Sequence, residues 1–478
     1  MLFNSIDFAV FLPIVFVLYW FVTQKNLKYQ NILIVVASYV FYGWWDYRFL
    51  ALIVFSTLVD FSIGKLLKTE TQPSKRKWLL WISIAVNIGF LGFFKYYNFF
   101  IDNFTSVFTF FGQEIKSNTL DIILPVGISF YTFQTLSYTI DVYKKKLEPT
   151  NDIVAFAAFV SFFPQLVAGP IERATNLLPQ FFKQRQFEYN TAVDGLRQIL
   201  WGLTKKVVIA DNCATYANMI FDNHASYSGS TLFVGAVFFA FQIYGDFSGY
   251  SDIAIGTSRL FGFNLKQNFA FPYFSRDIAE FWRRWHISLS TWFRDYLYIP
   301  LGGSRGSKVL QIRNVFVIFV ISGFWHGANW TFIVWGLLNA LYFLPVFLLK
   351  KNRIHTDIVA QNRLLPSFKE FVLMLVTFIL TVLAWVFFRA KNITEAFDYL
   401  NLMANKSLFT LPEIRPLYLM IFISFFLVIE WSGRRQLYAI ERLWLSYPRV
   451  LRWIIYLIMV VLIFLYGGKE QEFIYFQF

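Results

Sequence analysis

One histidine, His326, lies in the middle of a long apolar stretch. The stretch runs from Val315 to Leu349 without an Asp, Glu, Lys or Arg, and the whole chain has only four histidines. An ionisable side chain at membrane depth is costly to bury and usually marks a functional site. Because the ordinary pKa of histidine is about 6.5, a buried neutral imidazole is ready to accept a proton near neutral pH. We therefore predict that His326 acts as a base.

The length of this stretch predicts a break near the histidine. As one helix, residues 315–349 would be roughly 50 Å long, whereas the hydrocarbon core of a bilayer is about 30 Å thick. The segment must tilt strongly or break, and Gly323 and Gly327 flank His326. Irregular backbone at membrane depth is tolerated only where protein or a water-filled cavity surrounds it. We expect His326 to face such a cavity.

A second region, residues 271–305, carries far more charge than a lipid-facing segment tolerates. Its apolar residues recur at helical spacing and predict one amphipathic helix; they are Phe281, Trp285, Leu289, Trp292 and Tyr296. Arg283, His286, Ser290 and Arg294 fall on the opposite face. This helix either anchors at the membrane interface or covers an aqueous cavity. The loop with Gly302, Gly303 and Gly306 ends it.

The composition is that of an all-α integral membrane protein. Hydrophobic residues make up 57% of the chain and charged residues 15%, whereas soluble domains carry about 25% charge. The apolar runs predict about eleven to twelve membrane segments, some re-entrant or interfacial, in one domain over residues 1–478. The net charge of +14 comes from basic loops between apolar runs, as the positive-inside rule produces, and not from a nucleic-acid-binding face. This rule places residue 1 outside and Lys75–Lys77 in the cytoplasm.

Metal and disulfide chemistry are not expected. The single cysteine, Cys213, excludes an intrachain disulfide, and the few histidines and scattered carboxylates form no ligand pattern in the sequence.

Several long motifs, in order along the chain, resemble the membrane-bound O-acyltransferase family, and within it the bacterial alginate O-acetyltransferase branch. They are LPVGISFYTFQ at 124–134, QLVAGPIER at 165–173, QIYGDFSGYSD at 242–252, FWRRWHISLSTWFRDYLYIPLGG at 281–303 and WHGA at 325–328. The resemblance extends from the N-terminus to about residue 390.

The resemblance implies a fold with a central funnel and two functional histidines. His326 matches the family's invariant histidine and would activate an acceptor hydroxyl, and His286 would help from the cytoplasmic side of the funnel. The branch implies transfer of an acyl group, most naturally acetyl, from acetyl-CoA or a similar thioester in the cytoplasm to an exported or cell-surface polysaccharide. It also implies a bacterial cytoplasmic membrane and a periplasmic or surface acetyltransferase as partner. No bound cofactor is expected.

Four further residues are candidates for binding or orienting the donor. Arg283 and Arg294 would hold its phosphate groups near the basic interface, because phosphate cannot enter hydrocarbon. Asn329, one turn beyond His326, would orient the imidazole or donate to the oxyanion, or else form a hydrogen bond between helices. Asp252, like Asp246, needs a partner in its apolar surroundings, for which Arg259, Arg276 and Arg283 are candidates.

Two other functions remain open. A non-catalytic carrier of small molecules would also be a polytopic membrane protein, but we find no paired inverted repeats of the kind carriers show. Among enzymes, the alternative is transfer of D-alanyl groups to teichoic acid. Residues 299–303 (IPLGG) favour the acetylating branch.

Overall fold

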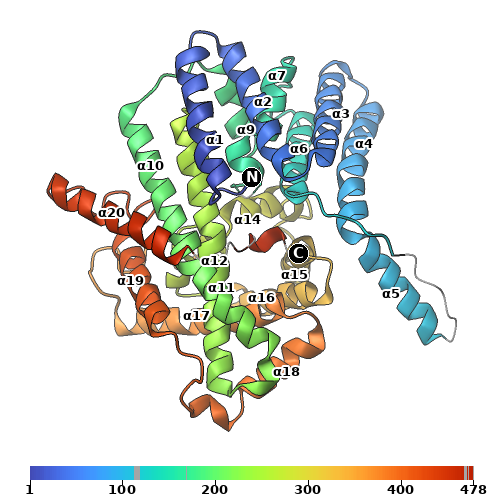
Figure 1. The fold of residues 1–478 in the computed structure, drawn as a ribbon. Helices are drawn as coiled ribbons and strands as arrows, with labels where there is room; N and C mark the ends of the chain where they lie inside the picture. Colours follow the sequence, from blue (N-terminus) through green and yellow to red (C-terminus); the bar gives the residue numbers. More distant parts are fainter. Residues whose placement is uncertain (112–118, 168, 468–470, 472, 477–478) are drawn as a thin grey trace. The chain divides into compact units, whose positions relative to one another are not determined.

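The computed structural model describes residues 1–111, 119–167, 169–467, 471 and 473–476. These residues form α-helices joined by loops and by short 3-10 and π-helical turns, and no β-strand occurs among them (Figure 1). The chain divides into two compact units. The first consists of Met1–Ala192 and Thr257–Leu265, and the second of Val193–Gly256 and Lys266–Phe478. The prediction of one domain stays a prediction.

The first unit holds the helices up to α9. They are α1 (Ile6–Val17), α2 (Leu27–Asp46), α3 (Leu50–Thr69), α4 (Pro73–Leu91), α5 (Tyr97–Phe110), α6 (Ile128–Tyr143), α7 (Ile153–Ser161), α8 (Phe163–Leu166) and α9 (Ala174–Leu177). A buried carboxylate, Asp60 of α3, links three of them. It accepts hydrogen bonds from Ser83 of α4 at 2.5 Å, from Asn87 of α4 at 2.9 Å and from Thr139 of α6 at 3.1 Å. Such polar contacts join helices that lipid alone does not press together.

The second unit contains the remaining helices. They are α10 (Tyr189–Leu203, which starts in the first unit), α11 (Asp211–Asp222), α12 (Gly229–Leu260, which from Thr257 on belongs to the first unit), α13 (Ile278–Arg284), α14 (Ile287–Phe293), α15 (Lys308–His326), α16 (Trp330–Leu348), α17 (Phe368–Arg389), α18 (Ile393–Met403), α19 (Leu417–Gly433) and α20 (Arg449–Tyr466). Three short turns matter for the site: η5 (Thr204–Ala210), η8 (Arg294–Tyr298) and η10 (Ile474–Phe476).

The helices confirm an all-α membrane fold. Among the described residues, seven helical stretches are long and apolar enough to cross a membrane. They are Leu27–Thr69, Pro73–Phe110, Gly229–Leu260, Lys308–His326, Trp330–Leu348, Phe368–Arg389 and Arg449–Tyr466. Three shorter apolar helices add to them: Ile6–Val22, Ile153–Leu166 and Leu417–Gly433. The sequence predicted eleven to twelve segments, a number that included such short runs and counted α2 and α3 separately. In the structure α2 and α3 belong to a single helical stretch, Leu27–Thr69.

The long apolar stretch around His326 breaks as predicted. Helix α15 ends at His326, Gly327 has extended backbone, and α16 begins at Trp330 after its N-cap Asn329. Gly323, which we also expected to break the helix, instead lies inside α15. A Cβ atom at Gly323 would collide with the carbonyl oxygen of Phe332 in α16. Glycine here lets two antiparallel helices approach closely and fixes the position of His326 at their turn.

Candidate active site

His326 is enclosed by aromatic side chains at the end of α15. Only 3% of its surface is exposed. Its ring centroid lies 5.2 Å from that of Trp335 in α16 and 5.3 Å from that of Phe388 in α17. Both contacts are edge-to-face, an arrangement that holds the imidazole plane through the ring quadrupoles. Three successive helices therefore surround this buried histidine with aromatic rings.

His286 is also buried, in a turn with unusual backbone geometry. It is 1% exposed and adopts a left-handed conformation with φ 44°, between the end of α13 and the start of α14. Non-glycine residues rarely adopt this region, and such strain collects at functional sites. The Oδ1 atom of Asn268 accepts from Nδ1 of His286 at 3.2 Å and from the hydroxyl of Ser288 at 2.8 Å.

These contacts define the state of His286. Burial lowers its pKa to about 3, so the ring is neutral at neutral pH. Donation from Nδ1 to Asn268 leaves Nε2 as the nitrogen that can accept a proton. His286 therefore has the tautomer of a base or hydrogen-bond acceptor.

The two histidines meet around the same aromatic side chains. The ring of Trp325 lies 6.2 Å from His286 and 5.0 Å from His326. The ring of Tyr475, in the C-terminal turn η10, lies 6.5 Å from His286 and 5.5 Å from His326. Two segments far apart in the sequence thus bring the histidines together, although neither histidine lines the cavity described below. The pair nevertheless stays a prediction as catalytic residues.

The prediction of a single amphipathic helix over this region is wrong. Residues 278–293 form two short helices, α13 and α14, because the backbone turns at Trp285 and His286. His286 consequently does not share a face with Arg283 and Arg294. It points into the aromatic interior, whereas both arginines line a cavity.

This cavity has a volume of about 430 Å³ and lies between α13, α14 and η8 on one side and α15 and α16 on the other. Its basic side carries Arg283, Arg294 and Arg353, and apolar side chains such as Phe319 and Phe343 complete it. Ser304, from the glycine-rich loop, also lines it. Ser322 of α15 lines it as well, one helical turn before His326. One turn corresponds to about 5.4 Å along the helix axis.

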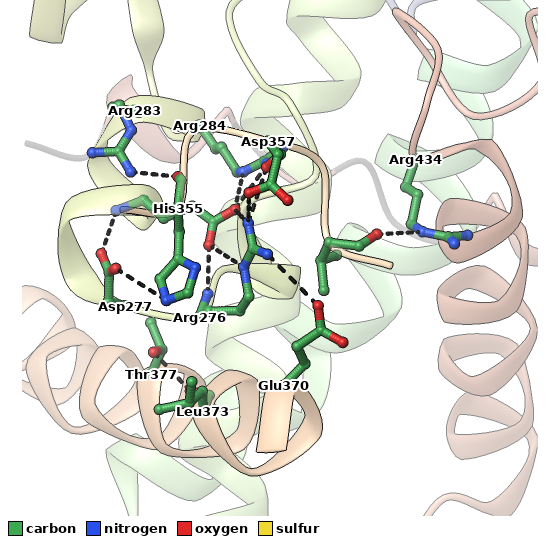
Figure 2. A network of polar contacts seen from close by, with 12 residues as sticks. Arg276, Asp277, Arg283, Arg284, His355, Asp357, Glu370, Leu373, Thr377 and Arg434 are labelled. Atoms are coloured by element: carbon green, nitrogen blue, oxygen red, sulfur yellow. Dashed lines mark hydrogen bonds and ion pairs between the residues drawn. The ribbon is translucent and has the colours of Figure 1, made fainter. Parts of the chain in front are cut away.

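Arginines also hold the loop that forms part of the cavity wall (Figure 2). Arg283 donates to the carbonyl oxygens of Asn352 and His355, both at 2.7 Å. Arg276 donates to the carboxylate of Asp357 at 2.9 Å. Burial opposes ionisation of Asp357, but this bond and the charge of Arg276 hold the pKa of Asp357 below its ordinary value. The loop between α16 and α17 is thus clamped in place by cations from one segment.

Arg294 is less constrained, since its partner in the structure is the adjacent Asp295 at 2.7 Å, and more than half of its side chain is exposed. It can turn towards an anion in the cavity at little cost.

The structure gives Asn329 and Asp252 other contacts than we considered. Asn329 caps α16 by accepting from the backbone of Thr331 at 3.0 Å, and it donates to the carbonyl oxygen of Lys391 at 2.8 Å. These bonds favour the structural interpretation of Asn329 over contact with the imidazole. Asp252 pairs with Lys205 at 2.6 Å and accepts from Gln198 at 2.8 Å. Asp252 does not line the 430 Å³ cavity but a hollow of about 10 Å³.

The prediction that arginines pair with the buried carboxylates Asp246 and Asp252 is wrong. Asp246 pairs with Lys206 at 2.8 Å, as Asp252 does with Lys205. We expected the positive charge to lie in basic loops between apolar runs, but the π-helical turn η5 carries both lysines into the interior.

Sequence reasoning missed Tyr475, as it missed Asn268 beside His286 and Arg353 in the cavity. The chain has 26 tyrosines and 60 phenylalanines, so an aromatic C-terminal segment is not distinctive by composition. The aromatic character of residues 473–476, next to a terminus and without helical periodicity, was the only available signal.

Comparison with known proteins identifies the family. The model of the membrane-bound O-acyltransferase family matches residues 150–379, a range that includes both histidines. A protein described as probable alginate O-acetylase AlgI, from Pseudomonas aeruginosa, is 39% identical over 92% of this chain and 82% of its own length. The peptidoglycan O-acetyltransferase of Helicobacter pylori is 34% identical over 100% of this chain and 98% of its own.

A third relative is more distant. The teichoic acid D-alanyltransferase of Bacillus subtilis is 28% identical over 46% of this chain and 58% of its own length. The helices that can cross a membrane, the two buried histidines and the extent of the similarity lead to one assignment. The chain belongs to the membrane-bound O-acyltransferase family and is a multi-pass membrane acyltransferase.

Proposed function

We propose that this protein passes an acetyl group from a cytoplasmic thioester, such as acetyl-CoA, across the bacterial cytoplasmic membrane for O-acetylation of an exported polysaccharide. A periplasmic or surface acetyltransferase would complete the transfer to the sugar. The carrying observation is the pair of buried histidines around Trp325 and Tyr475, one helical turn from a cavity with a basic side. Relatives named for acetylation of alginate and of peptidoglycan support an acetyl group and a polysaccharide.

In the proposed reaction, His326 removes the proton of an acceptor hydroxyl. The hydroxyl oxygen attacks the thioester carbonyl, a C–O bond forms and the C–S bond breaks. The proton held by the imidazole then goes to the departing sulfur. A general base of this kind contributes about 10²–10⁴ in rate. Neutral His286, with Nε2 able to accept, would orient a hydroxyl or thiol in the same space.

The cavity suits the donor in two respects. Arg283, Arg294 and Arg353 supply positive charge for phosphate groups, and the apolar walls accept a thin, uncharged arm. The phosphates then stay at the basic side while the acetyl group travels the remaining helical turn from Ser322 to His326.

The donor site is tested by changing its charge. The double variant Arg283→Ala with Arg294→Ala should raise the KM for acetyl-CoA about 10-fold or more, because two charge-assisted contacts are lost. Arg284→Ala is the matched control. It removes a donor to Asp357 in the same clamped loop but does not line the cavity. A double variant that uses donor like the parent would exclude this cavity as the donor site.

The polymer is tested in cells. Deletion of the gene should lower the O-acetyl content of exported polysaccharide, and the intact gene should restore it. Feeding labelled acetate and labelled D-alanine separately distinguishes the two acyl groups. Label from D-alanine appearing in teichoic acid, with acetylation unchanged, would favour the D-alanyl alternative that the Bacillus subtilis relative represents.

A further inference from the structure

The C-terminal segment, of which the structure describes residues 471 and 473–476, packs against α12. The ring of Phe473 lies 4.4 Å from that of Tyr250 and 6.0 Å from that of Phe247. Phe473 is 0% and Ile474 is 1% exposed. Figure 1 shows this short red segment beside α15 within the second unit. Tyr475 of this segment lies at the histidine pair.

A buried ion pair holds the segment by its backbone. The N–H of Ile474 donates to Oδ2 of Asp246 at 2.7 Å, and Nζ of Lys206 donates to the carbonyl oxygen of Gln471 at 3.1 Å. Asp246 and Lys206 are themselves paired at 2.8 Å. Both members of the pair thus contact the same peptide segment, and hydrogen bonds to charged groups are stronger than neutral ones.

The Asp246–Lys206 ion pair is buried, although burial of two charges is costly. Well-packed apolar residues are often as stable as such a pair, or more so. Apolar residues, however, cannot hold an isolated N–H and C=O in a fixed direction. Among the described residues that follow α20, η10 is the one regular element, so the backbone groups of Gln471 and Ile474 find their partners on other elements.

The anchor acts directly on the position of Tyr475. This residue follows Ile474, and consecutive Cα atoms are about 3.8 Å apart. Its ring packs at 4.5 Å on that of Phe247, the residue after Asp246, and contacts the rings of both His286 and His326. A shift of the Ile474 backbone therefore moves the ring that lies against both candidate bases.

We propose that Asp246 and Lys206 are positioning residues, which dock the C-terminal segment so that Tyr475 sets the arrangement of His326 and His286. The docking stands on geometry alone, whereas its effect on rate rests on the proposed function. Misplacement of reacting groups by about 1 Å can lower a rate about 100-fold.

Docking is measured without activity. In detergent, a thiol introduced as Ile474→Cys reports exposure by its rate of reaction with a maleimide-linked polyethylene glycol. The native thiol of Cys213 is buried, and protein without the introduced thiol gives the background. Asp246→Ala and Lys206→Met should raise the labelling rate 10-fold or more. Asp246→Asn, which keeps an acceptor oxygen for the N–H of Ile474, should raise it less.

Asp211→Asn is the matched control, because Asp211 pairs with the same ammonium at 2.7 Å. It should label close to the parent rate. Unchanged labelling in Asp246→Ala, or equal labelling in Asp211→Asn and Asp246→Ala, would refute the anchor.

Positioning is measured by kinetics of acetyl transfer. Asp246→Ala should lower kcat about 100-fold while the KM for acetyl-CoA changes less than twofold, because Tyr475 does not line the donor cavity. Ending the chain after Glu470 leaves Asp246 and Lys206 paired and should lower kcat equally. This truncation decides the question if Asp246 variants fail to fold. Normal kcat in a truncated chain, or in a variant with an exposed thiol, would refute positioning. Absence of transfer by the parent would instead refute the proposed function and leave the labelling result valid.

Discussion

Replacement of Asn268 by alanine should destabilise the turn that carries His286. The Oδ1 atom of Asn268 accepts from Nδ1 of His286, from the backbone N–H of Ser288 at 3.2 Å and from the Ser288 hydroxyl. All three residues are buried. Alanine removes the acceptor of these donors. Each buried donor that is left without a hydrogen bond lowers the free energy of unfolding by about 1–3 kcal/mol. The hydroxyl can rotate to another acceptor, so two donors determine the loss, which we expect to be about 3 kcal/mol.

The assay is thermal unfolding of the purified protein in one detergent at pH 7.5, together with acetyl transfer. Gln267→Ala is the control. This neighbouring side chain is half-buried and donates to the carbonyl oxygens of Phe269 and Leu437, which water can satisfy when the amide is lost. Asn268→Ala should unfold at a clearly lower temperature than Gln267→Ala and should also lose acetyl transfer. Equal unfolding temperatures for the two variants would show that Asn268 does not maintain the strained turn at His286.

Three other perturbations have defined outcomes. The pKa of His286 is lower in the folded protein than in the unfolded chain, so the unfolded chain binds the proton first as the pH falls. The free energy of unfolding should therefore be highest above about pH 6.5, be lower by about 2 kcal/mol at pH 5, and continue to fall towards pH 3. His286→Gln should remove this part of the pH dependence, and an unchanged acid profile in that variant would contradict the assignment. Asp60→Leu should lower the free energy of unfolding by about 2 kcal/mol, because three interhelical hydrogen bonds lose their acceptor. Asp60→Asn should lower it less. Equal unfolding temperatures for the two variants would argue against a role of Asp60 in joining α3, α4 and α6. A topology reporter fused after Arg76 should be cytoplasmic, and an extracytoplasmic signal would reverse the donor side.

The sequence predicted those parts of the site that depend on local chemistry. A histidine between two glycines in an uncharged stretch predicts a buried side chain at a helix break, and α15 does end at His326. Gly323 shows the limit of that reasoning. Glycine permits a break and also permits close helix packing, and the packed partner, Phe332, decides between them.

The wrong predictions share a cause: a local sequence pattern does not show which distant residues a segment will contact in the fold. The apolar stripe from Phe281 to Tyr296 continues through Trp285 and His286, and nothing in it signals a left-handed residue. Lys205 and Lys206 are typical of a basic loop, but they neutralise carboxylates on α12. Only the folded chain reveals that these charges are paired.

The central claim is that His326 is the base for acyl transfer. The most direct measurement is the kcat of purified His326→Ala for transfer of acetyl from acetyl-CoA, with the variant matched to the parent in thermal unfolding and in membrane insertion. Loss of the base should lower kcat about 10²–10⁴-fold, while the KM for the donor stays close to that of the parent. A folded His326→Ala protein that transfers acetyl at near the parental rate would show that His326 is not the base.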